Sequence, residues 1–88
     1  MEVKFTKTFE KDLKAIKDKE VILKVDEIIK CLRTSKVLSD IAGVKMLKGY
    51  RNCYRIRIGN YRLGLQLNGK VVWLARLMHR KEIYRYFP

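Results

Sequence analysis

Proline, cysteine and histidine are scarce in this sequence of 88 residues, which holds one Pro, two Cys and one His. With one Pro and five Gly, the chain is neither collagen-like nor a low-complexity linker. Cys31 and Cys53 are 22 positions apart and form no CxxC pair, so with His79 they give too few ligands for a structural zinc ion. We therefore expect no metal and no cofactor, and both thiols reduced and buried as small apolar residues.

Long hydrophobic runs are also missing. No apolar run approaches the roughly 18 residues that a membrane-spanning helix needs. The N-terminal stretch MEVKFTKTFEKD has no apolar segment of the length found in secretory signals. We therefore expect a cytoplasmic protein with no membrane partner.

Acidic residues are nearly absent from the second half of the chain. Residues 1–44 hold ten bases and eight acids, whereas residues 45–88 hold eleven bases and one acid, Glu82. The two halves carry net charges of +2 and +10, which together give the +12 of the whole chain. Seven of the eight arginines lie in the second half, and planar guanidinium groups match phosphate oxygens. This segregation favours a polyanionic partner, nucleic acid first, over a basic surface that is merely solvated.

The first half of the chain has helical periodicity after a short strand. Residues 2–5 alternate polar and apolar side chains, which predicts a strand. Thr6 or Thr8 can cap a first helix, because either hydroxyl accepts a bond from an unpaired N–H group. A second helix is predicted from about residue 19 to residue 33, with an apolar stripe wide enough to lie on a sheet. Residues 34–44 show no clear period.

The period changes to two in the second half. Residues 53–58 and 61–67 alternate and are separated by Gly59–Asn60, which predicts a β-hairpin. Asn68–Gly69 predicts a second hairpin that leads into residues 71–78. This last run is nearly all apolar, as is typical of a strand buried on both faces.

These elements predict one domain over residues 1–88 with an α+β fold of order β-α-α-β-β-β. A two-helix hairpin packs on one face of a mostly antiparallel four-stranded sheet. Residues 85–88 follow as a tail.

Strand parity directs basic side chains to the other face of this sheet. Arg55, Arg57 and Arg62 alternate with apolar residues that turn toward the helices, so the three guanidinium groups share the open face. Gly64 lies on the same face, where a missing side chain leaves room for a ligand to approach the backbone. The pattern predicts a basic surface that binds phosphate.

The end of the last strand adds an imidazole, a guanidinium and a phenol to this surface. If the strand pairs beside the hairpin, His79, Arg80 and Tyr84 reach the arginine face. A tyrosine can stack on a base, and RNA brings its own nucleophile, the 2′-hydroxyl, so cleavage needs no metal. Purely structural interpretations remain open: a solvated strand face for Arg55 and Arg57, core packing for Tyr84 and a structural role for His79.

Four segments of the chain stand out together: Phe5–Leu13, Leu47–Gly49, Tyr54–Arg62 and His79–Arg85. In combination they strongly resemble the RelE/ParE superfamily of bacterial and archaeal toxins. Their order and spacing cover nearly the whole chain. The resemblance implies the fold predicted above. It also implies a partner, a small RelB-like antitoxin whose acidic segment wraps the toxin and blocks its basic surface in a hetero-oligomer.

The resemblance implies an activity as well. RelE-like members are endoribonucleases that cut mRNA, typically in the ribosomal A site, by attack of the 2′-hydroxyl, and they leave a 2′,3′-cyclic phosphate. For this chain the resemblance implies a catalytic set of Arg62, His79, Arg80 and Tyr84. It implies a substrate-binding set of Lys48, Arg51, Arg55 and Arg57.

Two positions depart from RelE, which has catalytic lysines where this chain has Arg55 and Arg57. Arginine does not give up its proton, so these two side chains can neutralise phosphate but are poor general bases. His79 is the better proton carrier, because imidazole changes its charge near neutral pH. By position, Arg62 and Arg80 match transition-state arginines, and Tyr84 matches a tyrosine that stacks on or assists the cut nucleotide.

Two other functions remain open at this point. ParE-like members share the fold but poison DNA gyrase by binding, without an enzymatic step. A non-catalytic basic RNA-binding domain would bind RNA with an affinity that falls steeply with salt and would cleave nothing.

Overall fold

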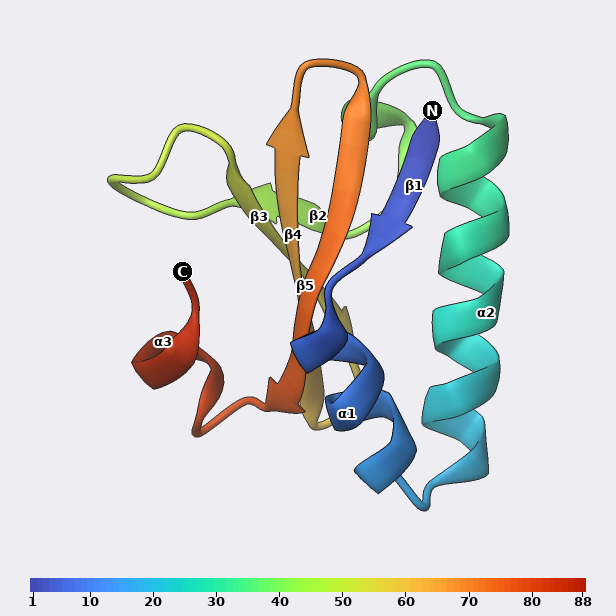
Figure 1. The fold of residues 1–88 in the computed structure, drawn as a ribbon, viewed down its shortest axis with the longest axis vertical. Coiled ribbons are helices and arrows are strands. Elements are labelled where there is room, and N and C mark those ends of the chain that lie inside the picture. Colours follow the sequence, from blue (N-terminus) through green and yellow to red (C-terminus); the bar gives the residue numbers. More distant parts are fainter.

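A computed structural model describes all residues from 1 to 88, in which two long helices and a short one flank a sheet (Figure 1). The elements in chain order are β1 (Glu2–Phe5), α1 (Lys7–Ala15), α2 (Lys19–Thr34), a 3₁₀ turn η1 (Leu38–Asp40), β2 (Val44–Met46), β3 (Cys53–Ile58), β4 (Tyr61–Asn68), β5 (Val71–His79) and α3 (Ile83–Tyr86). No helix among them combines the length and apolarity that crossing a bilayer requires.

The sheet has five strands in the order β1-β5-β4-β3-β2, so the prediction of four strands was wrong by one. The additional strand, β2, is three residues long and pairs antiparallel with β3 at the edge of the sheet. Three residues are too few to show an alternating pattern. The sheet is also mixed, because β1 pairs parallel with β5 while the other neighbours are antiparallel.

Both helices begin after a capping residue; of the two candidates Thr6 and Thr8, Thr6 caps the first helix, and Asp18 caps the second. The Thr6 hydroxyl accepts a hydrogen bond from the Phe9 N–H at 2.9 Å, and the Asp18 carboxylate accepts one from the Glu20 N–H at 3.0 Å. The two predicted hairpins are also present. Gly59 and Gly69 open their turns with φ of +59° and +61°, a conformation that glycine adopts without steric cost.

The main core lies between the sheet and the helices α1 and α2. Phe9 of α1 and the inward stripe of α2 are buried against the inner sides of β3, β4 and β5. The largest fully buried side chains of this core are Phe9, Val25, Leu32, Leu63, Leu65, Val72 and Leu74. The amphipathic pattern of the sequence therefore located this core.

α1 also closes the free edge of β5 beyond the end of β1. The Asp12 carboxylate accepts the Leu77 N–H at 3.0 Å and the Arg76 Nε at 2.8 Å. The Thr6 hydroxyl donates to the Ala75 carbonyl at 2.9 Å. Side chains of α1 thus satisfy backbone groups that would otherwise be open at a sheet edge.

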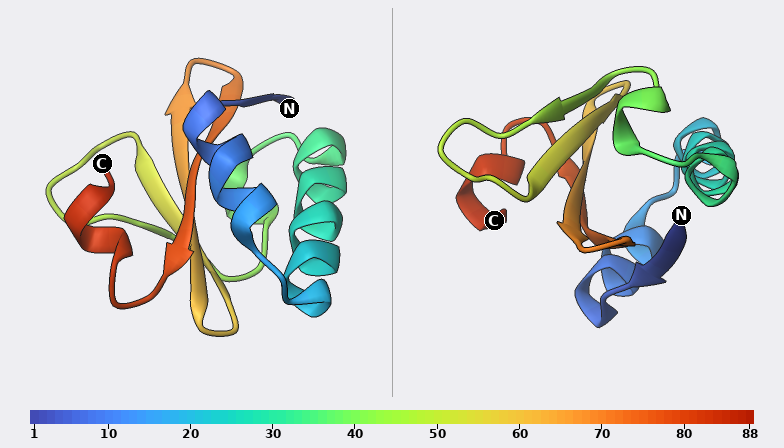
Figure 2. Two further views of the ribbon diagram at one scale, coloured as in Figure 1. Left: turned by 60° about the horizontal axis from the view of Figure 1, so that its bottom comes forward. Right: turned by 90° about the horizontal axis from the view of Figure 1, so that it is seen from above.

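A second, smaller core lies on the opposite face of the sheet from α2, under α3 (Figure 2). It contains Leu47, Cys53, Ile83 and Phe87, with Ala75 and Met78 packed against it. The prediction that residues 85–88 form a tail was therefore wrong. Ile83 and Phe87, four positions apart on one helical turn, fold the C-terminal segment back onto the sheet.

The two cysteines differ. Cys53 is buried, as predicted, and burial raises the pKa of its thiol. Cys31 is exposed on α2, so the prediction that both are buried was wrong for this residue. Neither forms a disulfide.

Candidate functional site

Like charges face each other across the strands of the open sheet face. Arg57 of β3 pairs with Arg62 of β4, and Lys45 of β2 pairs with Arg55 of β3. Cross-strand partners share a face, and like charges directly opposite each other destabilise a sheet. Two such pairs, side by side on one face, are unfavourable for the protein alone and suited to an anionic ligand.

Arg62 is at the centre of this group and is 6% exposed, the one charged residue among the buried ones. Its Nη1 donates to the carbonyls of Gly59 at 3.0 Å and Tyr61 at 2.9 Å, so it is anchored to the β3–β4 turn. Burial lowers the pKa of the Arg62 guanidinium, and the charges of Arg57 and Arg55 lower it further. The site therefore holds this cation at an electrostatic cost.

Arg55 has the clearest unsatisfied group. Its Nη1 is buried and has no hydrogen-bond partner, the only side-chain nitrogen or oxygen in that state. A buried charged donor without an acceptor costs more free energy than any other polar defect, because it has lost its water without replacement. An acceptor from outside the protein, such as a phosphate oxygen, would remove that cost.

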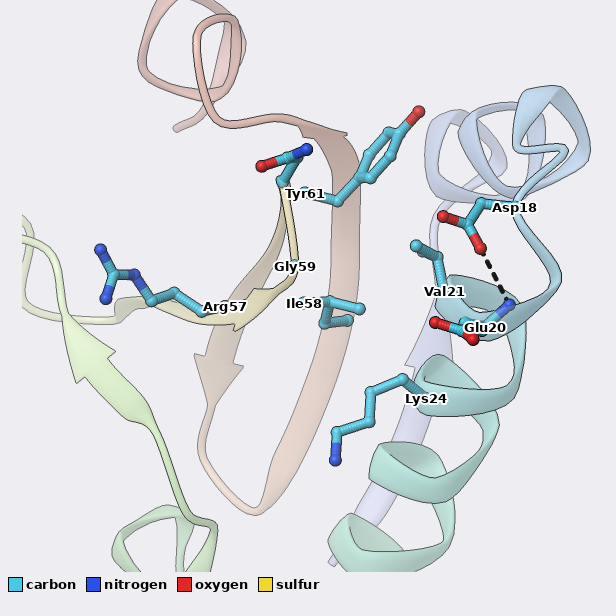
Figure 3. Close-up of a pocket in the computed structure, with 9 residues that line it drawn as sticks. Asp18, Glu20, Val21, Lys24, Arg57, Ile58, Gly59 and Tyr61 are labelled. Carbon is cyan, nitrogen blue, oxygen red and sulfur yellow. Dashed lines mark hydrogen bonds between the residues drawn. The ribbon is translucent and has the colours of Figure 1, made fainter.

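Arg57 is exposed and points away from α2 (Figure 3). A pocket of 420 Å³ lies between the α2 N-terminus and the β3–β4 turn, and the figure shows its lining side chains. Asp18 and Glu20 lie on the α2 side of this pocket, and neither forms an ion pair with Arg57. The acidic residues of the helix therefore leave the Arg57 charge free.

Charged residues elsewhere in the chain do form ion pairs, so the lack of partners for the arginines of this face is a local property. The four salt bridges are Lys4–Glu2, Lys24–Glu27, Lys30–Asp26 and Arg76–Asp12. Arg76 also lies on the open face, opposite Gly64, but its charge is taken up by the Asp12 carboxylate. Four of the eight carboxylates of the first half thus pair with residues outside the predicted site, and none pairs within it.

Arg80 and Tyr84 join the group from the C-terminal segment. The Arg80 N–H donates to the Asn60 carbonyl at 2.8 Å, which ties the chain after β5 to the β3–β4 turn. Both residues are close enough to Arg62 to change its pKa: the Arg80 charge lowers it and the Tyr84 phenol raises it. Tyr84 is 61% exposed on α3. The structure therefore brings together five of the predicted site residues, which are Arg55, Arg57, Arg62, Arg80 and Tyr84.

His79 lies apart from them. It pairs with Tyr61 on the inner side of the sheet, and the two rings meet edge to face with centroids 5.9 Å apart. The expectation that it reaches the arginine face fails because β5 contains an irregularity. The register shifts by one residue between the pairs Leu65–Leu74 and Gly64–Arg76, and such a bulge turns every later side chain to the other face. The His79 Nδ1 accepts a hydrogen bond from the Lys81 N–H at 3.2 Å.

The space at Gly64 is filled by the protein itself. A Cβ placed on Gly64 would lie 2.8 Å from Cδ2 of the Phe87 ring. The prediction that this glycine leaves room for a ligand was therefore wrong, because the C-terminal segment packs into that room.

The β2–β3 loop contributes the remaining predicted residues, Lys48 and Arg51, which are both exposed. Sequence reasoning did not identify three further residues near the site: Lys45, Tyr50 and Arg85. Lys45 becomes visible only through the short pairing of β2 with β3. Tyr50 and Arg85 line one groove with Lys48 and Tyr84, although 35 positions separate the first two in sequence.

The fold and this face define a class: a small α+β protein whose sheet presents a cluster of unpaired guanidinium groups and a phenol. The family model for the ParE toxin of type II toxin-antitoxin systems, parDE, matches residues 3–84. The chain is 45% identical over 89 residues to Toxin RelE3 of Methanocaldococcus jannaschii, with both sequences covered completely. It therefore belongs to the RelE/ParE superfamily of type II toxins.

Solved structures agree with this membership. A chain of the RelB-RelE antitoxin-toxin complex from Methanococcus jannaschii superposes with a TM-score of 0.81 at 43% identity, over 97% of this chain and 99% of that one. A chain of the archaeal RelE-RelB complex from Pyrococcus horikoshii OT3 gives a TM-score of 0.72 at 28% identity, over 90% and 93%. The predicted family is thus confirmed.

Proposed function

We propose that this toxin is an endoribonuclease that cuts mRNA, at the ribosomal A site, and so stops translation in the cytoplasm. The observation that carries the proposal is the group of arginines at Arg55, Arg57, Arg62 and Arg80, none of which is paired with a carboxylate. The orphaned Nη1 of Arg55 supports it further, because a phosphodiester supplies the missing acceptor.

The reaction follows from the chemistry of RNA. The 2′-oxygen attacks the adjacent phosphorus as its proton leaves, and the bond from phosphorus to the 5′-oxygen of the next nucleotide breaks. That oxygen takes up a proton, and the products are a 2′,3′-cyclic phosphate and a 5′-hydroxyl end. Arg62 and Arg80 are assigned to the negative charge that builds on the phosphoryl oxygens, where fixed cations lower the barrier most. Arg55 and Arg57, with Lys48 and Arg51, are assigned to the substrate phosphates.

Tyr84 is on the Arg62 side of the sheet, so we assign it to the proton of the leaving 5′-oxygen and to contact with the cut nucleotide. His79 lies on the Tyr61 side of the sheet and does not face the phosphate that Arg62 and Arg80 hold, so no proton transfer is assigned to it. The proton of the 2′-hydroxyl is assigned to a water molecule.

The partner proposed for this toxin is an antitoxin. The relatives from Methanococcus jannaschii and Pyrococcus horikoshii were solved as complexes of RelE with RelB. We propose a RelB-like protein whose acidic segment covers the arginine face of this chain, since carboxylates satisfy the same guanidinium groups as phosphate. Binding then blocks the RNA site directly in a toxin–antitoxin hetero-oligomer.

A second candidate function is inhibition of DNA gyrase without catalysis, which the match to the ParE family model favours. Purified toxin separates the two: the endoribonuclease cleaves RNA on programmed ribosomes and leaves supercoiling by gyrase unchanged, whereas the gyrase inhibitor does the reverse.

The decisive variants are Arg57→Gln and Arg62→Lys. The side chain of Arg57 is exposed and makes no hydrogen bond within the protein, so its loss spares the fold and is expected to slow cleavage about tenfold or more. Arg62→Lys keeps the charge but loses the guanidinium geometry; Arg62→Ala would also break the turn that Arg62 anchors. Lys36→Gln, a single charge removed between α2 and η1, is the control. Equal cleavage rates for Arg57→Gln, Arg62→Lys and Lys36→Gln would refute the assignment.

A further inference from the structure

A groove of 440 Å³ separates the β2–β3 loop from the C-terminal segment. The loop and α3 lie side by side in both views of Figure 2. The buried side chains of Leu47 and Phe87 give the groove an apolar surface. Lys48 and Tyr50 line it from the loop, and Tyr84 and Arg85 line it from α3. These residues come from two segments that are distant in sequence.

The two tyrosines make this groove unusual on the surface. Tyr50 is 54% and Tyr84 is 61% exposed, and both belong to the small set of large hydrophobic residues that the fold leaves in water. Neither is needed by a core, because the second core beneath them is closed by Ile83 and Phe87. Two flat, solvated rings at one groove are suited to another flat ring, which stacks on phenol with offset geometry.

The charges around the groove indicate what that ring belongs to. Lys48 and Arg85 are the charged side chains that line it, no aspartate or glutamate does, and neither base forms an ion pair. A ligand that combines an aromatic ring with negative charge on either side matches this groove, and a nucleotide within a nucleic-acid strand is such a ligand. The base must be unpaired, because a paired base presents no free face. Tyr84 also links the groove to Arg62, so both features lie along one path.

We propose that this groove binds one unpaired nucleotide of single-stranded RNA beside the cleaved phosphate, with its base against Tyr50 and Tyr84 and its phosphates at Lys48 and Arg85. The inference rests on the proposed function and adds to it a second contact point, which fixes the register of the strand in the site. Tyr50 is thus a substrate-binding residue, and the β2–β3 loop is part of the RNA surface.

The test uses a short RNA with 2′-O-methyl groups, which binds but cannot be cut, and with 2-aminopurine placed at successive positions. Stacking on tyrosine quenches 2-aminopurine, so one position is expected to lose fluorescence with the wild-type toxin. Tyr50→Ala is expected to abolish the quenching and to weaken binding about 5- to 150-fold, the range measured for one base–aromatic stack. Tyr50→Phe keeps the ring and is expected to bind within about twofold of wild type.

Tyr86→Ala is the matched control, since Tyr86 is a tyrosine of similar exposure, 52%, outside this groove. Binding and quenching by Tyr50→Ala equal to those of Tyr86→Ala would overturn the inference while leaving cleavage, and so the proposed function, intact. Normal quenching by a wild-type toxin that cuts no RNA would refute the proposed function and leave the groove standing. An acidic antitoxin peptide that occupies the groove while RNA does not would overturn the inference as well.

Discussion

Gly64→Ala tests whether the C-terminal segment is a structural part of the site. The new methyl would lie 2.8 Å from Cδ2, 2.9 Å from Cε2 and 3.0 Å from Cγ of Phe87, so the ring or the strand must move. Overpacking of this kind costs about 1–3 kcal/mol. Without Phe87 the same change would be neutral or stabilising by up to about 1 kcal/mol, because alanine restricts the unfolded chain more than glycine does. The Phe87 ring therefore decides whether Gly64→Ala lowers or raises the free energy of unfolding.

The magnitude can be isolated by a double-mutant cycle with Phe87→Ala. Phe87 is 5% exposed, and its truncation alone is expected to cost about 3–5 kcal/mol. In that background the added methyl fills part of the cavity, so Gly64→Ala is expected to cost nothing. The two sites are thus expected to couple by about 1–3 kcal/mol. Urea unfolding at neutral pH measures all four variants, and thermal unfolding should shift by about 4–8 °C for each kcal/mol.

The same substitution has an expected effect on function. Displacing Phe87 moves α3 and with it Tyr84, so Gly64→Ala is expected to slow RNA cleavage at temperatures where the variant is still fully folded. The reasoning is refuted if Gly64→Ala is as stable as wild type, or if its cost is the same with and without Phe87. Either result would mean that the ring does not occupy the space above Gly64.

Three further predictions concern α1 and the thiols. Asp12→Asn is expected to lower the free energy of unfolding by about 1–3 kcal/mol, measured in urea, because it leaves the half-buried Arg76 without its counter-charge. The exposed pair Lys30–Asp26 is the control, since Asp26→Asn should cost under about 0.5 kcal/mol. Equal losses for the two variants would contradict the argument. A thiol reagent is expected to label Cys31 at once and Cys53 only as the fold opens, and two fast thiols would contradict this. Because burial raises the Cys53 pKa above 9.0, its contribution to stability is present below pH 9 and is lost as pH rises through the folded-state value, a loss that Cys53→Ala should remove.

Local patterns in the sequence were sufficient for most of the fold. Helix α2 begins at Lys19, after its N-cap Asp18, and runs to Thr34, close to the predicted 19–33, because its apolar stripe is a local signal. The two hairpins were predicted correctly because the glycines at their turns are also local signals. The parallel pairing of β1 with β5 joins residues about 69 positions apart, and no local pattern encodes that contact.

The sheet face on which each candidate site residue lies was predicted correctly wherever the strand alternates without a bulge. β3 and β4 alternate regularly through Arg62, so the arginine face follows from parity alone. β5 does not, because the bulge near Ala75 reverses the side-chain direction, and this change moved His79 to the Tyr61 side. The sequence held one signal of this bulge: Leu77 is apolar at a position where strict alternation expects a side chain on the open face. It also held a signal of the second core, because the spacing of four between Ile83 and Phe87 indicates a helical turn and not a tail.

Arg76 shows what an arginine held for stability looks like in this fold. It lies on the same sheet face as Arg55, yet it has a carboxylate at 2.8 Å and its guanidinium lies 5.8 Å from the centre of the Tyr86 ring. Arg55, Arg57 and Arg62 have neither arrangement, although eight acidic residues in the first half of the chain could have supplied partners. Their mutual repulsion, the partial burial of Arg55 and the burial of Arg62 lower the stability of the free protein. This cost to the fold supports the proposal that these side chains serve to bind an anion.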